Sequence, residues 1–268
     1  MRETKYSNRV SLLLIIGSFT LVESVKINNL HVPEVIRHRA AVVLDCDFTV
    51  EESDQDLVVK WFFNSNNQTL VYQWIPASSS RPQVLGILKD RLNLEYAVSA
   101  VDSNGKHRAL HILDAGPDLS GNYTCSVSTL QSEDIRTKSM LVFVPERLLI
   151  IRRLHSSVGL MRIQCTAEGV FPSPEILLRS HKRELIETEI TSEQRGNLYD
   201  ISVSATLKAL EEPEEFSCEL RIPQANYTVR KETVIYPGNK GLQITQDIWI
   251  TILSCVPILC QRIFQILC

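Results

Sequence analysis

Apolar and polar positions alternate with a period of two in several short stretches of the chain, the pattern of half-buried β-strands. Together with apolar runs that do not alternate, such as RLLIIRR at 147–153 and EILLR at 175–179, these stretches predict strands at residues 41–46, 57–63, 94–98, 108–113, 137–144, 147–153, 161–165, 175–179 and 197–203. Turn residues separate them, including a DSNG segment at 102–105 that is typical of a hairpin turn. Counting outward from Cys46 places Val42 and Leu44 in the core. We therefore expect an all-β fold.

The strand at 57–63 and the apolar segment at 70–75 differ in how well alternation orients them. In the first, Trp61 pointing inward leaves Lys60 and Phe62 on the outer face. The second, LVYQWI, has no clean alternation. A strand with two apolar faces is either buried on both faces or part of a contact surface. Because Tyr72 and Trp74 share parity, alternation leaves open whether they face the core or the outside.

Four residues of the first half form a framework that indicates an immunoglobulin-like sandwich. Cys46 and Cys125 are 79 positions apart, Trp61 lies on the strand that follows the first cysteine, and Tyr123 precedes the second cysteine by two residues. In such sandwiches a disulfide joins the two sheets, the indole packs on it and the tyrosine hydroxyl closes a corner. The cysteine spacing favours a variable-type domain at residues 25–144.

A second cysteine pair, Cys165 and Cys218, is 53 positions apart and suits a shorter constant-type sandwich at residues 145–236. No tryptophan follows Cys165, so we expect Leu177, 12 positions after it, to take that place in the core. Phe216 stands where the corner tyrosine would be. The FPSP segment at 171–174 predicts a turn in which one prolyl bond could be cis. The predicted fold is thus two tandem immunoglobulin-like sandwiches, variable-type and then constant-type.

Composition and cysteine usage favour an extracellular location. The chain has 268 residues, 44% of them hydrophobic, and a net charge of −3 with a pI near 6.1. This balance does not suggest a nucleic-acid partner, which would call for a basic domain. Persistent disulfides between the four cysteines of residues 25–236 would require an oxidising compartment.

Both ends of the chain resemble processing signals. Residues 1–24 carry a basic start and an apolar stretch with small residues before position 25, which predicts a secretory signal peptide; the alternative is an uncleaved anchor helix. The tail at 237–268 contains Cys255, Cys260 and Cys268, and its apolar part is interrupted by arginine and glutamine. A glycolipid-anchor signal with Gly238 or Asn239 as attachment site, a membrane span and a secreted form with an unusual tail all remain open.

No motif predicts catalysis, a metal site or a cofactor. The chain lacks GxSxG, P-loop, HExxH and CxxC patterns. His107 and His111 are four residues apart, a metal-binding spacing on a helix, but they lie on a predicted strand and are expected to be ordinary outward histidines. We therefore expect a protein that is not an enzyme.

Three sequons predict glycosylation at Asn67, Asn122 and Asn226. Asn122 has the parity opposite to Tyr123 and should point out of the core. The acidic segment at 51–56 is either a solvated loop tip or a contact for a basic partner. Because Asp118 lies one position further from Cys125 than the usual corner aspartate, we do not expect an ion pair between Asp118 and Arg91.

The segments LVVKW (57–61), VYQWIP (71–76) and SGNYTC (120–125), followed by Pro145, resemble the arthropod beaten-path family. The GVFP turn at 169–172 is similar to costimulatory ligands and butyrophilins of the immunoglobulin superfamily. The first resemblance implies a cell-surface protein that binds another immunoglobulin-type receptor, with roles in axon guidance or neuronal recognition; a secreted immune or decoy factor is the alternative. The expected contact surface is the outer face of the first domain, with these candidates: Lys60, Phe62, Tyr72, Trp74 and Ile75.

Overall fold

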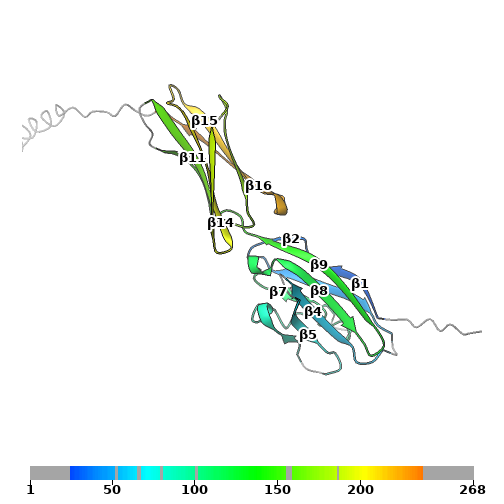
Figure 1. Ribbon diagram of the computed structural model, residues 1–268. Coiled ribbons are helices and arrows are strands. Elements are labelled where there is room, and N and C mark those ends of the chain that lie inside the picture. Colours follow the sequence, from blue (N-terminus) through cyan, green and yellow to red (C-terminus); the bar gives the residue numbers. More distant parts are fainter. Residues whose placement is uncertain are drawn as a thin grey trace, which may run out of the picture. The chain divides into compact units, whose positions relative to one another are not determined.

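The computed structural model describes residues 25–51, 54–64, 68–78, 81–99, 102–154, 159–185 and 187–237. The chain divides between Leu141 and Val142 into two compact units, each built from β-strands (Figure 1). The predicted signal peptide, Asn67, the anchor-site candidates Gly238 and Asn239, and the three tail cysteines lie outside the described residues. Among the described residues, no helix has the length and apolarity needed to cross a membrane.

The first unit is a sandwich of a three-stranded and a six-stranded sheet. The small sheet has the order β1-β3-β7 and contains β1 (Lys26–His31), β3 (Val42–Thr49) and β7 (Leu110–Ile112). The large sheet has the order β2-β9-β8-β4-β5-β6 and contains β2 (Val35–Arg37), β9 (Glu133–Phe143), β8 (Gly121–Ser128), β4 (Val58–Asn64), β5 (Thr69–Trp74) and β6 (Gln83–Val84). Pro33 lies between β1 and β2, where the chain leaves one sheet for the other. This is the strand arrangement of a variable-type domain.

The predicted framework forms the core of this unit. Cys46 and Cys125 form a disulfide, and the side chains of Trp61 and Tyr123 are completely buried. The Trp61 Nε1–H donates to the Arg108 carbonyl (3.0 Å), and the Tyr123 hydroxyl donates to the Leu119 carbonyl (2.9 Å). The polar groups of both buried aromatic side chains therefore have a partner, which removes the cost of placing them in an apolar interior.

The second unit is a constant-type sandwich of four and three strands. One sheet has the order β10-β11-β14-β13 and contains β10 (Leu148–Leu154), β11 (Leu160–Val170), β14 (Leu198–Lys208) and β13 (Thr188–Arg195). The other has the order β12-β15-β16 and contains β12 (Glu175–Ser180), β15 (Glu214–Ile222) and β16 (Tyr227–Ile235). Cys165 and Cys218 join the two sheets, and Phe216 is fully buried. The Phe171–Pro172 bond is cis. The predicted fold class is confirmed in both units.

The predicted core role of Leu177 is wrong. Leu177 is 41% exposed, whereas Leu178 is 3% exposed and pairs with Cys218 across β12 and β15. Trp61 pairs with Cys125 in the same way, so Leu178 is the residue that replaces the indole. A connecting segment at residues 171–174 separates β11 from β12, so the spacing from Cys165 does not determine which leucine of β12 faces the core.

Two further expectations for the first unit are corrected. Residues 94–98 form a turn and a bend instead of a strand, and the neighbouring Leu92 makes only an isolated bridge to Ile112. The unexpected ion pair between Arg91 and Asp118 does form, with 2.7 Å between Nη1 and Oδ2. The 3-10 helix η2 (Pro117–Leu119) turns the chain just before the corner, so Asp118 reaches Arg91 despite its shifted position.

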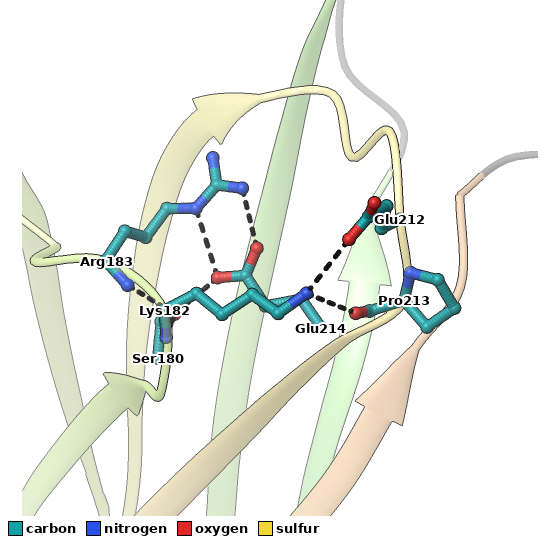
Figure 2. Close-up of polar contacts among 6 residues, drawn as sticks. All are labelled: Ser180, Lys182, Arg183, Glu212, Pro213 and Glu214. Carbon is teal, nitrogen blue, oxygen red and sulfur yellow. Dashed lines mark hydrogen bonds and ion pairs between the residues drawn. The ribbon is translucent and has the colours of Figure 1, made fainter.

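A buried carboxylate at one end of the second sandwich connects two parts of the chain (Figure 2). Glu214, at the start of β15, is 2% exposed and accepts two hydrogen bonds from the Arg183 guanidinium, at 3.0 and 2.6 Å, and one from the Ser180 hydroxyl. Lys182 binds the carbonyl of Pro213 (3.2 Å) and the carboxylate of Glu212 (3.4 Å). These contacts tie the turn after β12 to the start of β15, so this polar cluster serves the fold.

Candidate functional site

The outer face of the six-stranded sheet carries the residues that alternation assigns to it. In β4, Val59, Trp61 and Phe63 are buried, while the residues between them are half-buried. The strand register places these outer residues in rows across the sheet. One row contains Gln73, Lys60, Ser126 and Ile135, and the next contains Leu70, Phe62, Thr124 and Thr137.

Tyr72 and Trp74 do not belong to this face, which corrects their selection as contact candidates. They are 3% and 4% exposed, respectively. A register shift between Trp61 and Phe62 leaves Val71 as an extra residue in β5, so Tyr72 pairs with Trp61 and Trp74 pairs with Val59. Because their partners point inward, both aromatic side chains also point inward. The alternative that these aromatics face the core is therefore the correct one.

The two inward aromatics hold the turn after residue 102 against the sheet. The Tyr72 hydroxyl donates to the His107 carbonyl (2.7 Å), and the Trp74 ring meets the His107 ring edge-on with 5.6 Å between centroids. The His107 Nδ1 lies 3.1 Å from the Tyr96 carbonyl oxygen. Burial raises the pKa of the Tyr72 hydroxyl, so it stays protonated as a hydrogen-bond donor. His107 thus has a structural role. It lies in a turn and packs against Trp74, whereas the sequence predicted an outward histidine on a strand.

Lys60, Phe62 and Ile75 remain accessible, and two residues that the sequence analysis did not select join them. Leu70 is half-buried beside Phe62, and Ile135 on β9 is 53% exposed beside Ser126. Ile135 precedes the predicted strand at 137–144; the longer β9 brings it onto the face. The outer face therefore combines partly exposed apolar side chains with small hydroxyl residues.

The sequon asparagines in the described residues are accessible. Asn122 is exposed on β8 and accepts a hydrogen bond from the Ser139 hydroxyl (2.6 Å). Asn226 is exposed in the turn between η3 (Pro223–Ala225) and β16, with a positive φ of 48°. Neither asparagine is buried, so both side chains are open to glycosylation.

The described residues of the acidic segment, Glu51 and 54–56, make local contacts. The Glu51 backbone N–H donates to the Asp54 carboxylate (2.9 Å), and the Leu130 N–H donates to the Gln55 carbonyl (3.1 Å). Leu130, in the turn between β8 and β9, is 69% exposed. Carboxylates and one apolar side chain thus share this end of the sandwich.

The second unit has a shallow, mainly polar hollow. It has a volume of about 310 Å³ and lies on the outer face of β11, β14 and β13, where Thr166, Thr191 and Ser202 line it with hydroxyl groups. The described residues contain no group of three or more His, Cys, Asp or Glu side chains that could hold a metal ion. The sheet face of the first unit is therefore the stronger candidate site.

Comparison with known proteins gives one family match and many structural matches. The family model of the CD47 immunoglobulin-like domain, a V-set type, matches residues 12–148. A search of curated proteins found no match. In contrast, 1548 chains of solved structures match, so the fold by itself does not select a function.

Three of these structures span both units. Bovine butyrophilin is 15% identical with a TM-score of 0.57, over 76% of this chain and 94% of that chain. The extracellular portion of mouse CD200RLa is 14% identical with a TM-score of 0.51, over 75% and 96%. A chain from the structure of ICOS in complex with ICOS-L and an anti-ICOS-L VNAR domain is 17% identical with a TM-score of 0.53, over 75% and 98%. These likenesses show the shared fold.

Proposed function

Since the chain belongs to the CD47 immunoglobulin-like domain family, we propose that it is a cell-surface recognition protein that binds another extracellular protein through the outer face of its first domain. The observation that carries this proposal is the gathering of Phe62, Leu70 and Ile135 on that face, where they retain exposed apolar surface. Phe62 and Leu70 are cross-strand neighbours, and Ile135 lies on β9 in the adjacent row; exposed apolar groups that gather on one face of a soluble domain are typical of contact surfaces.

The partner that fits this proposal is another immunoglobulin-type protein. Across β4, β8 and β9 the charged residues of this face are Lys60 and Glu133, which have opposite signs, so the face suits a second sheet face better than a strongly charged partner. One structural neighbour was solved as a complex of ICOS with ICOS-L. A role in axon guidance or neuronal recognition, which the resemblance to the beaten-path family implies, remains a hypothesis.

A binding screen with a matched set of variants tests this function. Residues 25–237, which contain both cores and both disulfides, would be secreted and applied to a panel of cell-surface proteins. Phe62→Ala should weaken binding of the true partner by about tenfold or more, as truncating an interface anchor does. Leu113→Ala is the control, because Leu113 is 50% exposed but follows β7 in the opposite sheet. Equal binding by wild type and Phe62→Ala would place the site elsewhere.

We further propose that the chain reaches the cell surface by a cleaved leader and stays there by a C-terminal glycolipid. The support is the sequence of residues 1–24 and 237–268, with Gly238 or Asn239 as the attachment site. A phosphatidylinositol-specific phospholipase should release the protein from cells that express the full chain. Retention on treated cells would favour a membrane span, and spontaneous appearance in the medium would favour the secreted alternative.

A further inference from the structure

Four residues of the outer face form a small rectangle around the C-terminal end of β8. Val58 and Glu133 flank Ser128 in one row, and Lys60 and Ile135 flank Ser126 in the adjacent row. Neighbouring strands lie about 4.8 Å apart and alternate residues about 7 Å apart. The rectangle, which we call the diagonal patch, therefore measures roughly 10 by 7 Å at its Cα positions.

Charged and apolar residues alternate around the four corners of the diagonal patch. Lys60 and Glu133 carry opposite charges on one diagonal, and Val58 and Ile135 are the apolar residues on the other. Neither Lys60 nor Glu133 joins an ion pair within the described part of the chain. The Ser126 hydroxyl donates to one Glu133 oxygen (2.7 Å) and holds this carboxylate over the face. Ser126 and Ser128 lie between the corners, and the Ser126 side chain is covered, with 3% of the residue exposed.

This pattern is complementary to itself under two-fold symmetry. When two copies face each other, a two-fold axis lies in the plane between them. An axis close to the apolar diagonal exchanges the two charged corners, so Lys60 of each copy meets Glu133 of the other. The same axis passes near Val58 and Ile135, which then each pack against their counterparts. We propose that the first domain binds a second copy of this chain through the diagonal patch.

The glycosylation expected at Asn122 is compatible with this arrangement. Asn122 lies on β8 four residues from Ser126, on the side away from Ser128, and thus about 13 Å from it. A sugar there would stand beside the row that contains Phe62 and would leave the diagonal patch open. Self-association rests on the proposed function, because it uses the same face and shares Ile135 with it, but its charge-exchange test changes Lys60 and Glu133 and leaves Phe62 intact.

A charge-exchange experiment tests the self-association. Residues 25–237 would be examined by sedimentation equilibrium over a range of concentrations, and the wild type should show a reversible monomer–dimer equilibrium. Lys60→Glu and Glu133→Lys should each raise the dimer Kd by about tenfold or more, because symmetry places two like-charge contacts in each dimer. An equimolar mixture of the two variants should form a mixed dimer with a Kd near that of the wild type.

Two more variants complete the test. Ile135→Asp should weaken the dimer at least as much, since it places carboxylates near the axis. Lys138→Glu is the control, because Lys138 is exposed on the same strand but has the parity opposite to Ile135. A wild type that stays monomeric, variants that dimerise normally, or a mixture that does not recover would each overturn the proposal. If the protein is monomeric and still binds a panel member through Phe62, self-association is rejected and the proposed function stands.

Discussion

At the scale of single residues, Trp61 and Leu178 occupy equivalent positions in the two sandwiches. Each lies directly across from the second cysteine of its disulfide, Cys125 or Cys218. The indole satisfies its N–H through the Arg108 carbonyl, whereas the leucine brings no polar atom into the core. The second core thus fills this position with a smaller side chain that needs no hydrogen bond.

Truncation of adjacent leucines should separate these roles. Leu178→Ala should lower the free energy of unfolding by about 3 kcal/mol, because it removes buried methyl groups and leaves a cavity. Leu177→Ala should change it by less than about 0.5 kcal/mol, since Leu177 is largely outside the core. Chemical denaturation of residues 25–237 measures both, and equal losses would contradict the register of β12.

In the first unit, alanine substitution should affect stability at Trp74 and partner binding at Phe62. Trp74→Ala should reduce stability by about 3 to 5 kcal/mol, because the ring is buried against His107. Phe62→Ala should leave the thermal midpoint nearly unchanged and act on partner binding instead. Thermal unfolding followed by near-UV circular dichroism distinguishes the two, and a stable Trp74→Ala protein with lost binding would return Trp74 to the contact surface.

At the scale of elements, the turn after β12 is secured by its contact with the start of β15. Glu214 is buried with its carboxylate paired to Arg183, and Ser180 closes the same cluster. A buried ion pair adds little net stability, but loss of one partner leaves an uncompensated charge. The cluster is therefore sensitive to a change in either member.

Arg183→Ala should destabilise the second unit by about 2 kcal/mol, less than a fully buried pair would lose, because the Arg183 side chain is 38% exposed. Arg179→Ala on the exposed side of β12 is the control and should have little effect. Urea unfolding of both variants gives the comparison. If Arg183→Ala were as stable as the wild type, the prediction would be wrong, because water would then compensate the Glu214 charge as well as the guanidinium does.

At the scale of the whole molecule, each unit has its own core and its own disulfide. The Cys46–Cys125 link spans 79 residues and the Cys165–Cys218 link spans 53. On the chain-entropy model each link contributes about 4 kcal/mol by restricting the unfolded chain. Each unit can therefore be destabilised separately.

Paired Cys165→Ser and Cys218→Ser substitutions should expose the second unit to proteolysis and spare the first. The Cys46→Ser and Cys125→Ser pair should give the reverse pattern. Limited proteolysis with mass analysis of the resistant fragment reads out both. Simultaneous digestion of both units in each variant would show that they do not unfold independently.

The sequence by itself determined the fold class, both disulfides and the inner face of most strands. Cysteines, Trp61 and Tyr123 at regular spacings admit few alternatives, and strict alternation orients a strand without knowledge of its neighbours. The outward positions of Lys60 and Phe62 followed from this alternation alone.

Only the tertiary structure decided the features that depend on pairing between strands. The extra residue at Val71 buries Tyr72 and Trp74, the pairing of β12 with β15 places Leu178 opposite Cys218 in the core, and η2 brings Asp118 to Arg91. The diagonal patch likewise joins residues of β4 and β9 that are more than 70 positions apart. A bulge or a cross-strand neighbour is set by hydrogen bonds between distant segments, and no local pattern in the chain records it.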